Sequence, residues 1–199
     1  MIPTSIKCLH LSTCLSRIEV MDKVEVSELH VRIGQVKIGS PGQVLTAILG
    51  SCVGIGFFFP QRQIYGLAHC LLSQSSSQPV ASSAAQTGRT REDGQLVGNG
   101  RHVDKAIESL LKMMDIQDEE RRQLRVVLAG GANMSMPFDT PPSQLVGSVN
   151  AKFARQAIRS AGLRLLGDDL GGLNGRRISI NCDSGEYDIQ QIPRLGGTV

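Results

Sequence analysis

Three side chains between positions 46 and 69 could together carry out nucleophilic catalysis. Cys52 follows Gly50 and Ser51, which interrupt an apolar run, and His69 lies 17 positions later (69 − 52) in another apolar run. An imidazole beside a thiol can lower the pKa of the thiol and produce a reactive thiolate. Thr46, six positions before Cys52 (52 − 46), carries a hydroxyl that could orient the imidazole, a part usually played by Asp or Asn.

The backbone around Cys52 could supply the other part of such a site. The N–H groups of Cys52 and of its neighbours Ser51 and Gly50 follow a strand break, where they could point at one position and stabilise an oxyanion. The alternative is an inert core cysteine and a core histidine, because cysteine is among the most buried residue types. Residue types and spacing leave both interpretations open.

Composition narrows the class of protein. A chain of 199 residues with 41% apolar content suits one domain with a sizeable core. The net charge is only +3 and aromatic residues make up 4%, so neither a basic nor a base-stacking surface for nucleic acid is expected. No apolar run reaches the roughly 18 residues of a membrane span. Five cysteines in no disulfide or zinc spacing indicate a reduced, cytoplasmic protein.

The first half of the chain predicts β-structure around these residues. Alternating or continuous apolar residues favour strands at Leu29–Ile38, Val44–Leu49, Cys52–Phe59 and Ile64–Leu72. The run after Cys52 is apolar throughout, which is typical of a strand buried on both faces. We expect this block to form a β-meander.

The second half alternates helices with strands. Apolar spacing predicts an amphipathic helix over Val103–Met114 and another from about Ser143 to Ala161. Strands are expected at Leu124–Ala129 and Leu163–Leu166, and a closing hairpin turns at Asp183–Glu186. About seven strands and two helices indicate an α+β or mixed α/β layered domain.

The ends of this domain are set by changes in composition. Residues 1–23 lack a regular pattern and are expected to be a disordered extension, which leaves residues 24–199 as one domain. Cys8, His10 and Cys14 lack a fourth ligand, so no metal site is predicted there. The polar stretch Ser73–Asn99 is either a substrate-facing loop or a solvated insertion.

Other residue pairs that could do chemistry have simpler explanations. Gly130-Gly131 and Gly171-Gly172 lack the Lys-Ser/Thr of a P-loop and are expected in tight turns that need positive φ. Asp168 and Asp169 are adjacent, so on a strand they would face opposite ways and make a poor acid/base pair.

A set of short motifs, in a fixed order, resembles the CheD family of chemoreceptor glutamine deamidases from Glu28 to Ile192. Each motif is modest alone, and the order and spacing make the set specific. The motifs are T-A-I-L-G-S-C-V from Thr46 to Val53, G-L-A-H from Gly66 to His69, Arg101–Ile107, A-G-G-A-N from Ala129 to Asn133, Val146–Asn150, Asp169–Gly172 and Gly175-Arg176.

This resemblance implies an activity and a site. The family's catalytic cysteine, histidine and threonine match Cys52, His69 and Thr46, and the chemistry needs no metal or cofactor. The implied reaction is deamidation of glutamine side chains on methyl-accepting chemotaxis receptors. The implied fold is a layered α/β sandwich similar to that of the cytotoxic necrotizing factor deamidases. The alternative function is a non-enzymatic regulatory module that binds a CheC-like phosphatase. The extension before Met21 and the long stretch after Leu72 depart from the family pattern.

Overall fold

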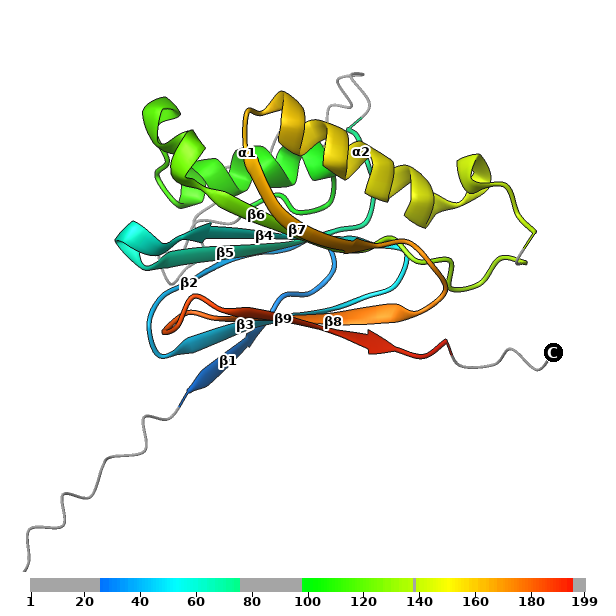
Figure 1. The fold of residues 1–199 in the computed structure, drawn as a ribbon, viewed down its shortest axis with the longest axis horizontal. Helices are drawn as coiled ribbons and strands as arrows, with labels where there is room; N and C mark the ends of the chain where they lie inside the picture. The colour runs from blue at the N-terminus through cyan, green and yellow to red at the C-terminus, as the bar shows by residue number, and fades with distance from the viewer. Residues whose placement is uncertain (1–25, 76–97, 138, 195–199) are drawn as a thin grey trace, which may run out of the picture.

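The computed structural model describes residues 26–75, 98–137 and 139–194, which form three layers (Figure 1). A four-stranded sheet lies against a five-stranded sheet, and two helices cover the outer face of the five-stranded sheet. Both sheets are mixed, and all strand pairs but two are antiparallel. The predicted layered α/β domain with two main helices is therefore confirmed, with nine strands in the described residues instead of about seven.

The four-stranded sheet combines the two ends of the described chain. Its strand order is β1-β3-β8-β9, with β1 parallel to β3 and the other pairs antiparallel. The antiparallel pair β8–β9 is the predicted closing hairpin. The strands are β1 (Ser27–His30), β3 (Gln43–Leu49), β8 (Gly175–Asn181) and β9 (Tyr187–Ile192).

The five-stranded sheet occupies the middle layer and has the order β2-β5-β4-β6-β7. Its central strand β4 is buried along its whole length, as its continuous apolar sequence predicts. β7 continues well past the short strand expected from the sequence. The strands are β2 (Val36–Gly39), β4 (Val53–Phe59), β5 (Ile64–Cys70), β6 (Arg125–Gly130) and β7 (Arg164–Leu170).

The helices close the core on one side of this sheet. α1 (Val103–Met113) and α2 (Val146–Ser160) each present an apolar stripe to it, close to the predicted ranges. Three short 3₁₀ turns, η1 (Pro60–Arg62), η2 (Asp118–Gln123) and η3 (Pro142–Gln144), lie in the connections. A second core fills the space between the two sheets. Neither helix of the described chain has the length and apolarity needed to cross a membrane.

The predicted β-meander is wrong, because the chain changes sheets three times within it, between β1 and β2, β2 and β3, and β3 and β4. β1 and β2 lie in different sheets, and a turn with Gly34 at φ +79° separates them. β3 and β4 also lie in different sheets, so the Gly50–Cys52 break carries the chain from one layer to the other. The apolar pattern of each run predicts the individual strands, but pairing between strands depends on contacts distant in sequence.

Some predictions lie outside the described residues. These are the disordered extension at residues 1–23, with Cys8, His10 and Cys14, and most of the polar stretch after Leu72. The single-domain boundary at residue 24 stays a prediction.

Candidate active site

Cys52 lies at one end of the sandwich, in the turn by which the chain passes from β3 to the central strand β4. It is 6% exposed and packs in the core between the two sheets. The carbonyls of its turn are all held by neighbouring segments: Gly50 O accepts from the N–H of Ala132, and Cys52 O accepts from the N–H of Gly131. The turn is therefore fixed against the loop that follows β6.

His69 lies on the adjacent strand and faces the same layer. It pairs with Gly54, two residues beyond Cys52, so Cys52 and His69 are diagonal neighbours across the β4–β5 ladder. Leu67, which shares the parity of His69, packs in the same inter-sheet core as Cys52. The structure thus places the predicted thiol and imidazole on one face of the sheet, near the same end of its strands.

Hydrogen bonding defines the tautomer of His69. Its Nδ1 lies 3.2 Å from the carbonyl oxygen of Val31, an acceptor only, so Nδ1 carries the proton and donates it. Nε2 is then the unprotonated nitrogen, and it is buried without a hydrogen-bond partner among the described residues. A buried, unpaired acceptor with its ring held in place is suited to receive a proton.

Thr46 reaches His69 through the backbone and not through its hydroxyl. Thr46 Oγ1 donates to Glu28 Oε1 at 2.9 Å and lies 3.3 Å from His30 Nδ1. Leu45 and Ala47, its neighbours on β3, face the inter-sheet core, so the Thr46 side chain points to the opposite face of its sheet.

The main chain of Thr46 connects it to the site instead. The N–H of Val31 donates to the carbonyl oxygen of Thr46 at 2.7 Å, and the carbonyl of Val31 accepts from His69. The β1–β3 pairing therefore fixes the position of the carbonyl group that orients the imidazole.

Thr46→Val should lower turnover about three- to tenfold, because β1 loses two side-chain hydrogen bonds while the Thr46 carbonyl and the β-branched shape remain. Steady-state kinetics compared with a His69 variant provide the measurement. A loss as large as that of the His69 variant would indicate direct contact between the hydroxyl and the imidazole. An unchanged rate would show that the hydrogen bonds of the Thr46 hydroxyl to β1 do not contribute to catalysis.

Backbone amides at the turn are free to bind an anion. Among residues 26–75, 98–137 and 139–194, no acceptor faces the N–H groups of Gly50, Ser51 or Cys52. Gly50 and Ser51 are partly exposed, and Cys52 is buried. Free amides next to a thiol are the donors that an oxyanion hole requires.

Asn150 is a site residue that the sequence interpretation missed. Its Nδ2 donates to Ser51 O at 3.2 Å and to Leu71 O at 2.9 Å, so it ties the Cys52 turn to the end of β5. Asn150 is 2% exposed and lies in the buried stripe of α2 among Gly147, Ala151, Ala154 and Ile158. The sequence does contain one signal for it, because Asn150 is a single amide side chain in an otherwise apolar stripe of a predicted helix, where a polar group needs a buried partner.

Two glycines allow the loops around the turn to approach closely. Gly130 has φ +101°, and a Cβ there would lie 2.3 Å from the carbonyl oxygen of Cys52. Gly131 has φ +67° and faces the backbone of Gly147 on α2. The expected tight turns at Gly130-Gly131 and at Gly171-Gly172 (φ +85° and +69°) are confirmed.

Burial decides the charge state of the pair in the free protein. It raises the pKa of the Cys52 thiol. It lowers the pKa of His69, and the nearby His30 lowers it further, while the hydrogen bond to Val31 opposes this. Both changes favour a neutral thiol and a neutral imidazole. The sequence-based expectation of a lowered Cys52 pKa is therefore opposed by desolvation.

The other described cysteines are less exposed. Cys70 and Cys182 are 0% exposed, and burial raises the pKa of Cys182 to about 11. Cys70 packs on the helix side of β5, opposite to His69, as strand alternation predicts. No three His, Cys, Asp or Glu side chains of the described chain lie close enough together to hold a metal ion.

A partly buried ion pair, with a buried arginine and a partly exposed aspartate, supports the loop beside the site. Arg176, 4% exposed, donates to Asp169 Oδ1 at 2.7 Å and also binds the carbonyls of Gly171 and Asn174. The same loop holds the N–H of Asn133 through Gly172 O. Arg176 therefore holds the β7–β8 loop in place, and Gly172 O connects that loop to the loop that fixes the Cys52 turn.

Asp169→Ala should lower the free energy of unfolding by about 2 kcal/mol, because it leaves the buried Arg176 guanidinium with carbonyl partners but without its carboxylate. Asp168 is the matched control: it faces the other way and pairs with Arg155, which is 41% exposed. Asp168→Ala should cost no more than about 1 kcal/mol. Urea unfolding measures both, and equal losses would contradict this assignment.

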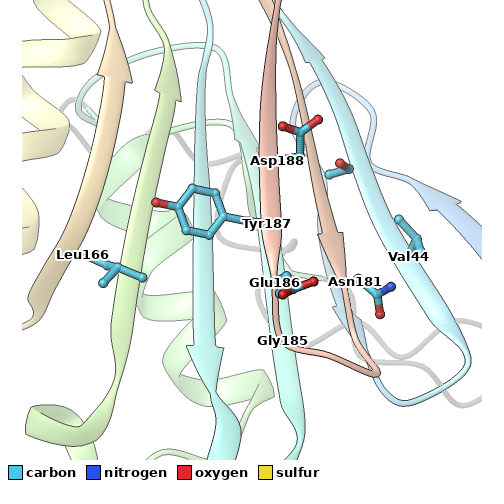
Figure 2. A pocket seen from close by; sticks show the side chains of 8 residues that line it. Val44, Leu166, Asn181, Gly185, Glu186, Tyr187 and Asp188 are labelled. Atoms are coloured by element: carbon cyan, nitrogen blue, oxygen red, sulfur yellow. The ribbon is translucent and has the colours of Figure 1, made fainter.

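Two hollows among the described residues lie away from Cys52. One, of about 610 Å³, is lined by residues of β3, β7 and the β8–β9 hairpin, including Glu186, Tyr187 and Asp188 (Figure 2). Its hairpin turn lies beside Tyr65, at the opposite end of β5 from His69. Another, of about 490 Å³, runs along α2. Neither is lined by Cys52 or His69.

Known proteins similar to this chain place it in a family. A family model described as "CheD chemotactic sensory transduction" matches residues 86–191, a range that begins after His69. A "Probable chemoreceptor glutamine deamidase CheD" of Bdellovibrio bacteriovorus is 30% identical over 84% of this chain and 96% of its own length.

Further relatives carry similar names. A "Probable chemoreceptor glutamine deamidase CheD" of Jannaschia sp. is 34% identical and covers 84% of this chain and 83% of its own length. The "Chemoreceptor glutamine deamidase CheD" of Halalkalibacterium halodurans is 26% identical, over 85% of this chain and 93% of its own length.

A solved structure, the "hypothetical protein YfiH" of Bacillus licheniformis, covers 68% of this chain and 50% of its own, with a TM-score of 0.39 and 12% identity. That similarity is too low to inform fold or function. The family model and the relatives together cover most of the chain. The chain belongs to the CheD family.

Proposed function

We propose that this protein is an amidohydrolase that converts glutamine side chains of methyl-accepting chemotaxis receptors into glutamate, with release of ammonia. One observation supports this most: Cys52 lies beside free backbone amides and diagonal to a histidine whose unprotonated Nε2 has no described partner. Relatives named as chemoreceptor glutamine deamidases support the choice of substrate.

In the first half of the reaction, His69 Nε2 accepts the Cys52 thiol proton as the sulfur attacks the carbonyl carbon of the glutamine side chain. The amides of Gly50, Ser51 and Cys52 stabilise the oxyanion of the tetrahedral intermediate. The imidazolium then gives its proton to the amide nitrogen, the C–N bond breaks, and ammonia leaves a thioester on Cys52.

Water completes the reaction. His69 removes a proton from a water molecule, whose oxygen attacks the thioester carbonyl carbon. The C–S bond breaks, the thiolate takes the proton back from His69, and the product is a glutamate side chain. Thr46 acts in this scheme through its carbonyl, which holds Val31 and thereby the orientation of His69. No step uses a metal or cofactor.

The resemblance to cytotoxic necrotizing factor deamidases and binding of a CheC-like phosphatase remain predictions. The first is what the family resemblance implies, and the layered α/β architecture is compatible with it. The second is the competing function, in which the protein regulates a phosphatase and the site is unused. A free nucleophile, base and amide donors at one edge favour the enzyme.

The test is ammonia release from purified receptor cytoplasmic domains, followed with a coupled glutamate dehydrogenase assay. Release should be proportional to protein concentration and should stop when the susceptible glutamines are replaced by alanine. Absence of release, together with tight binding to a CheC-like phosphatase, would favour the regulatory module and overturn the proposal.

The pH profile of kcat/KM should report His69. Its imidazole must be neutral to accept the thiol proton, and its pKa is lowered, chiefly by burial. Activity should therefore persist below the ordinary histidine pKa of about 6.5 and fall only under more acidic conditions. His30→Gln removes a like charge near His69 and should move this acid limb to higher pH. An acid limb above the ordinary value in the unmodified protein would contradict the assignment.

A further inference from the structure

The face of α2 that leads away from the candidate site carries a stripe of cations. Lys152, Arg155 and Arg159 recur at spacings of three and four, so they lie on one side of the helix with Ser148. These four residues, with Gln156, Leu170 and Gly171, line most of the groove of about 490 Å³ between α2 and the end of β7. We call this surface the α2 groove.

The groove begins beside the active-site edge. Asn150, in the same part of α2, binds Ser51 O, and Gly147, next to Ser148, packs against Gly131. Figure 1 shows α2 lying across the sheet with its first turn at the edge where β6 and β7 end. From Ser148 to Arg159 the helix rises about 16 Å. A polypeptide bound in the groove could therefore extend directly into the site.

The charge of the groove is not neutralised by its own side chains. Asp168 on β7 is the acid that pairs with a groove cation, and Arg155 holds both of its carboxylate oxygens, at 2.6 and 2.9 Å. Arg159 lies close enough to Asp168 to affect its pKa, and Lys152 is exposed with no ion pair among the described residues. Three cations against one carboxylate leave the groove positive.

The first turn of the same helix exposes apolar side chains that are not part of the groove lining. Val146 and Val149, one turn apart on α2, are 53% and 40% exposed. A long positive groove on a helix that also exposes valines suits a protein segment with acidic and apolar residues better than a small anion.

We infer that the α2 groove docks an acidic stretch of the protein substrate next to its target glutamine. This rests on the proposed function and adds a specificity element to it. Lys152 and Arg159 attract the acidic side chains of the substrate. Arg155, hydrogen-bonded to Asp168, forms a fixed part of the groove wall. The docking is electrostatic, so it should contribute to affinity and association more than to the chemical step.

The experiment is a binding measurement that does not depend on turnover. Protein carrying Cys52→Ala is titrated into a fluorescently labelled chemoreceptor cytoplasmic domain, and Kd is read from anisotropy. Adding Lys152→Glu and Arg159→Glu should raise Kd at least about tenfold. Adding Lys112→Glu and Arg122→Glu instead makes the same change in charge on exposed residues outside the groove, and should leave Kd within about twofold.

Salt gives a second readout. Raising the ionic strength from about 0.05 M to 0.3 M should weaken binding of the parent protein strongly, and that of the groove variant much less. Equal Kd values for the groove and control variants, or absence of binding by the parent, would overturn the inference. Receptor binding that depends on the groove without ammonia release would support the inference and count against the proposed function.

Discussion

Replacing Cys52 with alanine is expected to lower ammonia release by at least about 10³-fold, because the proposed reaction has no other nucleophile. The substitution removes one sulfur atom at the partly open end of the inter-sheet core, where Cys52 is 6% exposed. Stability should therefore change by only about 1 kcal/mol, and thermal unfolding should show a folded protein. Steady-state rates on the receptor domain provide the measurement.

Cys70 provides the matched control for this prediction. Cys70 is the last residue of β5, close to Cys52 in the same sheet. It is fully buried on the helix side and plays no part in the reaction. Cys70→Ala should retain near-normal kcat while costing somewhat more stability, because it leaves a cavity. A large loss of turnover in folded Cys70→Ala, or normal turnover in Cys52→Ala, would show that Cys52 is not the nucleophile.

Replacing His69 with glutamine is expected to lower kcat by about 10³-fold or more, with little change in KM. The raised pKa of Cys52 makes this loss large, since a neutral thiol needs a base at the moment of attack. Glutamine fills a similar volume and can donate to Val31 O, so the effect of removing the base is separated from that of removing the support. Rates and circular dichroism of the variant provide the measurement.

The pH dependence of the variant distinguishes a base from a packing residue. Without an imidazole, residual turnover should rise about tenfold per pH unit through the neutral range, because it then depends on the small fraction of Cys52 thiolate. The unmodified protein should show the acid limb of His69 and then a plateau. A His69→Gln profile parallel to that of the unmodified protein would remove His69 from proton transfer.

The positions of Cys52 and His69 were predictable from local sequence. A Gly-Ser break before a continuous apolar run placed the thiol at the start of a buried strand, and alternation along β5 separated His69 from Cys70. Family resemblance then selected these residues over the ordinary alternative of an inert core. The two helices were also predictable, because each has a clear apolar stripe.

The rest of the site depends on pairing between distant segments. Val31 holds His69 because β1 pairs in parallel with β3 and ends beside β5, and no local pattern specifies that arrangement. For the same reason the Thr46 hydroxyl faces Glu28 and His30, although its spacing from Cys52 suggested a route to His69. The pKa of Cys52 depends on how deeply the turn is buried, which composition does not give.

Peptide mapping of the receptor by mass spectrometry tests the central claim most directly. A receptor cytoplasmic domain is incubated with the unmodified protein or with Cys52→Ala, digested, and examined for glutamines converted into glutamates. The account predicts conversion at specific glutamines with the unmodified protein and none above background with Cys52→Ala. Equal conversion by both proteins, or no conversion by a folded unmodified protein that binds the receptor, would contradict it.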